Sequence, residues 1–263
     1  MQDDDSKKWV WWGIPIVVAA GLIAALYYGR KHKAEPVAQQ IEAPPAAEAP
    51  APLDNDHPIE TDAGGNEPLP ALGQSDTAIN ESLNGVFGHS LDRFLVPKDL
   101  VRHIVATVDN MPRKKTSMQM WPLRPTAGVP AVDARGESIT LSEDNYARYA
   151  PLMTIVRNTD TKQLVGIYKH YYPLFQQAYQ ELGYPDGYFN NRLVEVIDHL
   201  LATPDVKGPI RLTQPGVLYE FADPALEQLS AGQKLLIRMG GENAAALKLK
   251  LRELRREVAK ETR

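Results

Sequence analysis

Side chains that could perform acid–base or metal chemistry are few, and the densest group lies around residue 195. Glu195 and His199 stand four positions apart with Asp198 beside the histidine, so a helix would place the carboxylate and the imidazole on one face. A zinc site needs a third ligand, and no second histidine falls in that segment. His103 and His170 belong to other segments, and no pattern brings them to His199. We therefore expect no metal ion and no cofactor.

A serine nucleophile has equally weak support. Ser138 or Ser142 could pair with His199 in a fold, but such pairs can be drawn in almost any chain. The HExxH, GxSxG, P-loop and GxGxxG patterns do not occur, and the chain has no cysteine to act as a nucleophile or thiolate ligand. The sequence therefore favours a non-enzymatic protein. The alternative is a periplasmic hydrolase that acts on a cell-wall polymer through Glu195 or Asp198 with His199.

Aromatic side chains are the first candidates for binding. They gather in one part of the chain, as Tyr168, Tyr171, Tyr172, Phe175, Tyr179, Tyr184, Tyr188 and Phe189. A tyrosine offers a flat face and a polar tip, which suits a sugar ring or a peptide groove. The stripe from Tyr168 through Phe175 to Tyr179 has helical spacing, which favours core packing. Tyr172, Tyr184 and Tyr188 remain as candidates for a ligand groove.

Basic residues in an irregular stretch are the second candidates. The stretch 111–130 holds four prolines and shows neither helical nor strand periodicity, and long irregular connections are often functional. Arg113, Lys114 and Lys115 stand there with Trp121, and cations beside an aromatic ring suit an anionic polymer or a phosphate. The alternative is a solvated turn, which is the more common role of a short charge run.

The stretch Trp9–Tyr28 determines where these residues act. It has twenty residues without a charge, which is the length an α-helix needs to cross a bilayer, and aromatic residues flank both ends. A signal peptide has a shorter apolar core followed by small residues at a cleavage site, whereas this run ends in Tyr27 and Tyr28. We therefore predict a short cytoplasmic tail (1–8) and a retained single transmembrane helix (9–28).

The next segment, 29–74, is an acidic linker rich in proline and alanine. No lysine or arginine occurs between Lys33 and Arg93, and such a composition cannot bury enough apolar surface to fold. By analogy with spacers that hold domains away from a bacterial inner membrane, we expect the following domain in the periplasm. The lysines and arginines flanking the anchor mildly favour the opposite orientation. The net charge of −4 and the pI near 5.9 give no reason to expect nucleic acid as a partner.

Apolar periodicity predicts one mainly α-helical domain over 75–260, with at most a small β-hairpin. Helices are expected from Ser75, from Pro97 to Pro112, and from Ser142 with an interruption at Pro151. A longer helix is expected from Asp160 to Gly183, with a kink near Lys169–Tyr172 because Pro173 lies inside it. Three more helices are expected: one that holds Leu193–Leu201 and stops at Pro204, one over Ser230–Met239 and one over Glu242–Lys260. Glu137–Leu141 is a candidate strand, and Ile210–Thr213 with Val217–Phe221 a candidate hairpin. The last helix carries a narrow row of leucines on one side. We favour packing of this row on the protein's own domain; the alternatives are pairing with a partner helix and contact with anionic lipid.

Long blocks of the chain resemble a known family. They are SKKWVWWGIPIVVAAGLIAALYYG (Ser6–Gly29), FLVPKDLVRHIVATVDN (Phe94–Asn110), YARYAPLMTIV (Tyr146–Val156) and GIYKHYYPLFQQAYQELGYPDGYFNNR (Gly166–Arg192). Over about residues 6–260, the chain resembles the bacterial membrane-anchored family known as domain of unknown function 3014. The resemblance implies a Gram-negative source and an inner-membrane location. It transfers no catalytic or binding residue, because the family has no established activity.

Together these observations predict a single-pass inner-membrane protein. Its periplasmic helical domain is expected to act as a non-enzymatic envelope interaction module. The expected partners are the membrane, through the protein's own transmembrane helix, and a protein or a cell-wall glycan.

Overall fold

The structure is a computed structural model, and it describes residues 54–60, 68–126 and 128–259. The predicted tail, the predicted transmembrane helix Trp9–Tyr28 and most of the predicted linker lie outside these described residues. Within the described ranges, no helix has the length and apolar character required to span a membrane.

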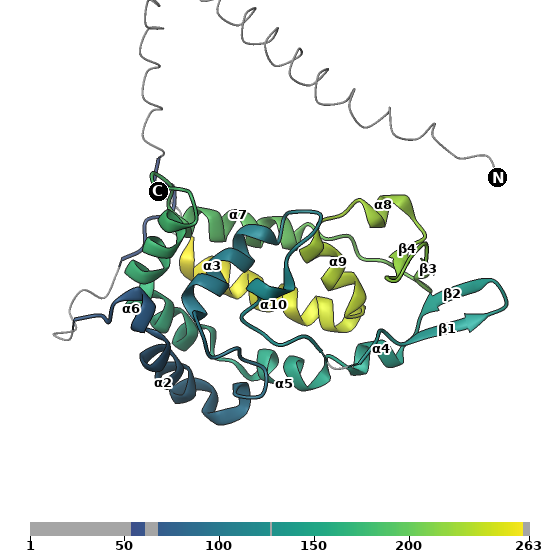
Figure 1. The fold of residues 1–263 in the computed structure, drawn as a ribbon, viewed down its shortest axis with the longest axis horizontal. Helices are drawn as coiled ribbons and strands as arrows, with labels where there is room; N and C mark the ends of the chain where they lie inside the picture. Colours follow the sequence, from purple (N-terminus) through teal and green to yellow (C-terminus); the bar gives the residue numbers. More distant parts are fainter. Residues whose placement is uncertain (1–53, 61–67, 127, 260–263) are drawn as a thin grey trace, which may run out of the picture. The chain divides into compact units, whose positions relative to one another are not determined.

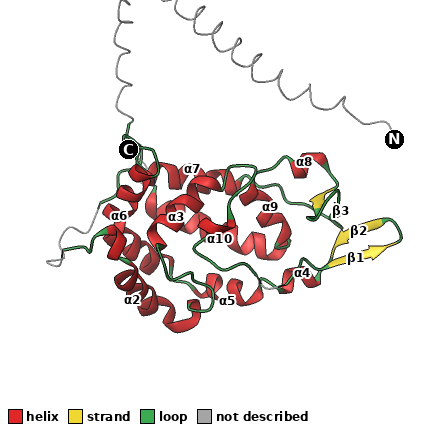
Figure 2. Cartoon of the chain, in the orientation of Figure 1, coloured by secondary structure: helices red, strands yellow, loops and turns green. Residues whose placement is uncertain are grey.

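The described chain is mainly helical, as the sequence predicts (Figures 1 and 2). Its α-helices are α2 (Asp76–Phe87), α3 (Leu100–Asn110), α4 (Asp144–Ala147), α5 (Ala150–Asn158), α6 (Thr161–Glu181), α7 (Phe189–Leu201), α8 (Pro224–Glu227), α9 (Ala231–Arg238) and α10 (Gly241–Val258). Short 3-10 helices are η1 (Leu72–Gln74), η2 (Gly88–Leu91) and η3 (Met118–Met120). The strands are β1 (Val132–Arg135), β2 (Ser138–Leu141), β3 (Arg211–Thr213) and β4 (Glu220–Phe221).

The strands form a four-stranded antiparallel sheet in the order β1-β2-β3-β4. The predicted strand at Glu137–Leu141 is present as β2, and the predicted hairpin is present as β3 and β4. Strands β2 and β3 pair at Ile139 and Leu212, so the strand and the hairpin belong to one sheet. The expectation of at most a small hairpin is therefore wrong. Strand β1 gave no sequence signal, because most of its side chains are exposed and it lacks an alternating apolar pattern.

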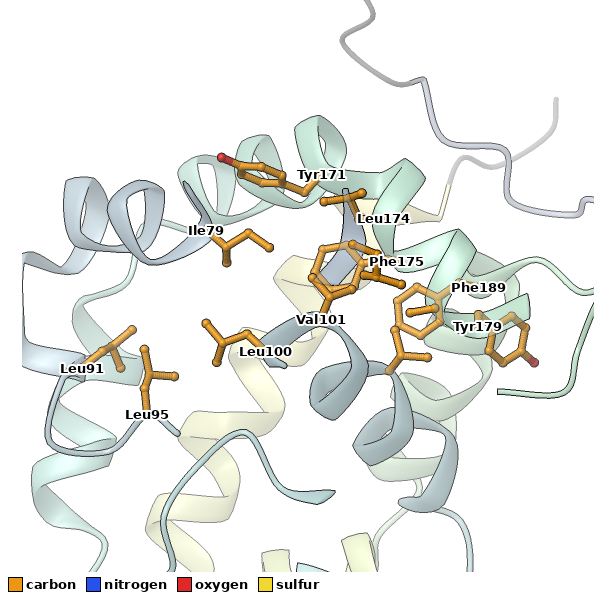
Figure 3. Close-up of a cluster of buried hydrophobic side chains, with 13 residues drawn as sticks. Ile79, Leu91, Leu95, Leu100, Val101, Tyr171, Leu174, Phe175, Tyr179 and Phe189 are labelled. Carbon is orange, nitrogen blue, oxygen red and sulfur yellow. The ribbon is translucent and has the colours of Figure 1, made fainter. Parts of the chain in front are cut away.

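Helix α6 supplies much of the main core. The carboxylate of Asp160 caps its N-terminus by accepting hydrogen bonds from the backbone N–H groups of Lys162 and Gln163. The favoured prediction that the aromatic stripe of this helix packs in the core is confirmed. Five buried side chains of α6 belong to the cluster drawn in Figure 3, with residues of α2, α3 and α7; they are Tyr171, Leu174, Phe175, Ala178 and Tyr179. Val165, nearer the start of α6, is also buried and packs with Val194, Ile197 and Val258. Phe175 stacks on Phe189 with ring centroids 5.8 Å apart.

Helix α3 begins later than the proline at 97 suggests. Asp99 has a left-handed backbone (φ 52°), so the helix starts at Leu100. The carboxylate of Asp76, the first residue of α2, accepts the N–H groups of Asp99 at 2.7 Å and Leu100 at 2.9 Å. The backbone N–H groups at the start of α3 thus find their acceptor in a side chain distant in the sequence. The residues next to the helix start give no sign of this contact.

Helix α10 docks on its own domain, as favoured from the sequence, and packs against α5, α6, α7 and α9. One of its buried residues is charged: Lys248 donates from Nζ to the Thr203 carbonyl at 2.6 Å and to Asp205 Oδ1 at 2.7 Å. The Asp205 side chain itself is exposed, and the hydrogen bond from Lys248 lowers the pKa of its carboxyl group.

Because only one partner of this ion pair is buried, removing either partner is expected to cost a different amount of stability. Asp205→Ala leaves the buried Lys248 ammonium without its counter-charge, whereas Lys248→Met removes the cation and keeps the apolar stem that packs beneath it. We expect Asp205→Ala to lower the urea midpoint more than Lys248→Met. A greater loss in Lys248→Met would mean that the hydrogen bond from the ammonium to the Thr203 carbonyl contributes more to stability than an unpaired buried charge costs.

Candidate functional site

An open cleft of about 560 Å³ runs along α7, and we call it the α7 cleft. Its walls come from α7, from the end of α6 and from residues 54–60, which we call the strap. The lining residues are Asp54, Asp56, His57, Tyr179, Gly187, Tyr188, Asn191, Arg192, Val194, Glu195 and Asp198. Most of the lining residues are polar or charged, and carboxylates outnumber cations among them.

Amide side chains at the start of α7 hold the strap in place. The His57 N–H donates to Asn191 Oδ1 at 2.9 Å, and Asn191 Nδ2 donates to the Asp54 carbonyl at 2.9 Å. Asn190 Nδ2 donates to the His57 carbonyl at 2.7 Å. Residues 54–60 fall in the segment predicted as linker, whereas in the structure they hydrogen bond to α7.

Asn190 links the strap to the rest of the fold. Its side chain is fully buried, its Oδ1 accepts the Tyr168 hydroxyl at 3.1 Å, and its Nδ2 also donates to the Val258 carbonyl at 2.9 Å. One amide therefore connects α6, α7, the last residue of α10 and the strap. Because both ends of the amide are engaged, Asn190 holds the strap at a fixed position against the start of α7.

A buried carboxylate, Asp109, holds the arginine that lines the cleft. The Asp109 side chain is only 2% exposed; its Oδ1 accepts Arg192 Nε at 3.0 Å, and its Oδ2 accepts an Arg113 N–H at 2.8 Å. The Tyr184 hydroxyl donates to the same Oδ2 at 3.3 Å. Arg192 in turn reaches Glu195 at 2.8 Å and the Asp109 carbonyl at 2.9 Å. This network fixes the guanidinium that lines the cleft.

The predicted acid–base residues are divided between two places. Glu195 and Asp198 line the cleft, where Glu195 pairs with Arg192 and Asp198 with Arg255. His199 Nε2 instead lies 2.8 Å from the Ser230 hydroxyl, which is buried and caps α9. Neither Ser138 nor Ser142 is its partner. In the ranges 54–60, 68–126 and 128–259, no three His, Cys, Asp or Glu side chains form a group that could hold a metal ion.

This chain matches the model of a known protein family. The family model described as "Protein of unknown function (DUF3014)" matches residues 100–255, which is more than half of the chain. The chain belongs to this family. The match confirms the resemblance seen in the sequence blocks. Comparison with curated proteins and with solved structures finds no match.

The DUF3014 match covers most of the site described above. Asp109, Asn190 and Arg192 lie inside the matched range, whereas the strap lies outside it. The family description assigns no activity to these residues.

Tyr179 gives the DUF3014 domain a titratable group at the cleft wall. Its ring stacks on Tyr184 with centroids 4.6 Å apart, and burial raises the pKa of its hydroxyl from 10.0 to about 12 despite the opposing charge of Arg192. Because the folded pKa is higher than the unfolded one, the folded state favours the protonated tyrosine. The associated stability is fully present below about pH 10 and is lost as the pH rises toward about 12.

We therefore expect Tyr179→Phe to lose less stability than wild type when the pH is raised from neutral to alkaline values. The measurement is the urea midpoint of both proteins across about pH 8 to 12, a range set by these pKa values. Tyr188→Phe, which changes an exposed hydroxyl, is the matched control. Parallel alkaline losses in wild type and Tyr179→Phe would contradict the assignment.

The structure brings together some of the predicted binding residues. Tyr188 lines the α7 cleft, and Arg113 and Tyr184 meet beside it at Asp109. Tyr172 is half-buried and hydrogen bonds to Gln176 through its hydroxyl.

The other predicted binding residues lie apart from the cleft. Lys114 and Lys115 are exposed in the turn after α3, and neither lines the cleft. Trp121 lies in the connection after η3, and its buried Nε1 has no hydrogen-bond partner within the described residues. The three consecutive basic residues therefore do not form one surface, because Arg113 pairs with Asp109 whereas Lys114 and Lys115 are exposed to solvent.

Proposed function

We propose that this DUF3014 protein is a single-pass inner-membrane protein whose helical domain lies in the periplasm as a non-enzymatic envelope interaction module. The uncharged stretch Trp9–Tyr28 and the acidic proline-rich segment after it support the anchor and the spacer. The spacer raises the concentration of the domain near the bilayer while leaving it free to reach a partner.

The α7 cleft is the observation that carries the binding role. Its walls are helices and a strap fixed by Asn190 and by the Asp109 network, so little conformational freedom is lost when a partner is bound. Tyr188 at its edge is 36% exposed and offers an aromatic face. The carboxylates of Asp54 and Asp56 accept hydrogen bonds, which suits hydroxyl and amine donors of a cell-wall glycan or a basic protein segment.

The engagement of the acid–base groups supports a role without catalysis. Glu195 and Asp198 each have an arginine partner, and His199 is bonded to a serine that caps a helix. A general base must be within reach of the proton that it abstracts, and His199 is not among the residues that line the cleft.

Crosslinking in intact cells tests the proposal. Full-length protein is compared with Tyr188→Ala and Asp56→Lys, which alter the cleft, and with Leu249→Ala, which alters an exposed position on α10. We expect the cleft variants to reduce recovery of the crosslinked partner by roughly tenfold, the effect of losing about 1.4 kcal/mol of binding. Leu249→Ala is expected to match wild type. Recovery of no protein or glycan above background, or equal recovery in all variants, would contradict the proposal.

A further inference from the structure

The hairpin of β1 and β2 projects from the helical body, and β1 is an edge of the sheet (Figure 1). Strand β1 comes first in the strand order, and within the described ranges no strand pairs with its outer side. Asp133, Ala134 and Arg135 in this strand are exposed to solvent. An edge strand presents a row of backbone N–H and C=O groups to which another strand can bind.

The hydrogen bonds between β1 and β2 show which backbone groups of β1 point outward. The Ser142 N–H donates to the Ala131 carbonyl at 3.0 Å, in register with the paired strands, so the backbone of Ala131 bonds toward β2. Successive residues of an antiparallel strand bond to opposite sides, so Asp133 also bonds toward β2. The N–H and C=O groups of Val132 and Ala134 therefore point away from the sheet.

The charged side chains of β1 are self-complementary. Asp133 and Arg135 are two positions apart, so they lie on one face of the strand, and within the described residues neither makes an ion pair. If a second β1 pairs antiparallel with Ala134 opposite Ala134 of the partner subunit, Asp133 of each copy lies opposite Arg135 of the partner subunit. Opposite charges directly across two strands stabilise the pair, whereas the register with Asp133 opposite itself would set like charges against each other.

The other face of β1 matches in the same register. Ala134 pairs with Ile139 of β2, and Ile139 pairs with Leu212 of β3, so these three side chains form one apolar row across the sheet. The row begins at the buried Leu212 and ends at the exposed Ala134. A second copy in this register would continue the row, with one Ala134 beside the other.

We propose that β1 binds β1 of a second copy of this chain, antiparallel and with Ala134 opposite Ala134 of the partner subunit. The two sheets then form one continuous sheet about a two-fold axis, which makes the interface isologous. One pair of short strands buries little surface, so the dimer is weak and depends on the local concentration of the chain. This interface does not depend on the α7 cleft or on the function proposed for it.

Disulfide trapping of the full-length protein in membranes tests the pairing and its register. The chain has no cysteine, so Ala134→Cys supplies the only thiol. Residues that face each other in a hydrogen-bonded antiparallel pair have Cα atoms about 5.5 Å apart, which a disulfide can join. With copper phenanthroline as oxidant, we expect Ala134→Cys to form a disulfide-linked dimer. Asp133→Cys, which is out of register with itself, and Leu249→Cys, on the exposed face of α10, are the controls and are expected to stay monomeric. Absence of the Ala134→Cys dimer, or an equal or greater yield from either control, would overturn the proposal.

An exchange of charges distinguishes a second copy from an unrelated strand as the occupant. Asp133→Arg sets arginine against arginine and Arg135→Asp sets aspartate against aspartate, so each is expected to lower the dimer yield roughly tenfold. The double variant Asp133→Arg/Arg135→Asp restores opposite charges in the same register and is expected to recover the original yield. Amine-reactive crosslinking of the charge variants without Ala134→Cys gives a second readout, and thermal melting verifies that each variant folds. Unchanged yields in the single variants, or no recovery in the double variant, would overturn the proposal.

Discussion

Asp109→Ala is expected to lower the free energy of unfolding by about 3 kcal/mol, because it leaves Arg192 without its buried counter-charge. Removing one member of a buried ion pair costs about 3–5 kcal/mol in general. The lower figure applies here because Arg192 keeps Glu195 and the Asp109 carbonyl as acceptors. Urea unfolding of wild type and variant measures the difference.

Arg113→Ala is the matched control for this substitution. Its side chain is 56% exposed, so its ion pair with Asp109 is screened by water and its loss is expected to cost less than about 1 kcal/mol. Equal losses in Asp109→Ala and Arg113→Ala would show that the Asp109 network is not anchored by Arg192.

Asn190→Ala is expected to cost about 3 kcal/mol as well. It removes a fully buried amide and leaves the Val258 carbonyl and the Tyr168 hydroxyl without their partner. Asn191→Ala, whose hydrogen bonds reach only the strap, is the control and is expected to cost about 1 kcal/mol. Similar losses in the two variants would contradict the central position of Asn190.

The near-isosteric change Asn190→Asp gives a sharper test of the same contacts. The new carboxylate would face the carbonyls of His57 and Val258, which previously accepted hydrogen bonds from the amide. Its ionised form is disfavoured in the folded state, so the folded pKa is raised and stability is expected to recover as the pH falls. A variant whose stability does not improve on mild acidification would show that this side chain is not enclosed by those carbonyls.

The sequence predicted the helices well because their apolar spacing is regular. Helix α3 illustrates both the success and its limit. Val101 and Val105 lie on its buried face, and Asp109 follows at the same spacing of four, so a carboxylate in an apolar row was a usable signal of a buried ion pair. Its partner Arg192 comes from α7, and no local pattern identifies such a pairing.

The strap and the sheet could not be derived in this way. The strap is held through backbone groups by Asn190 and Asn191, and hydrogen bonds of that kind leave no periodicity in the sequence. The sheet depends on the pairing of Ile139 with Leu212, which are distant in the chain. Among the predicted binding residues, Tyr188 lies at the α7 cleft because it directly precedes α7, whereas Trp121 belongs to a loop whose position sequence does not set.

A topology measurement tests the central claim of a membrane-anchored envelope module most directly. Alkaline phosphatase, which is active only after export, is fused after Arg263 of the full-length chain and assayed in intact cells, with the fusion quantified by immunoblot in carbonate-washed membranes. The proposed function predicts high phosphatase activity from a fusion that stays in the membrane fraction. A well-expressed fusion that is silent, or one that carbonate removes from the membranes, would contradict it.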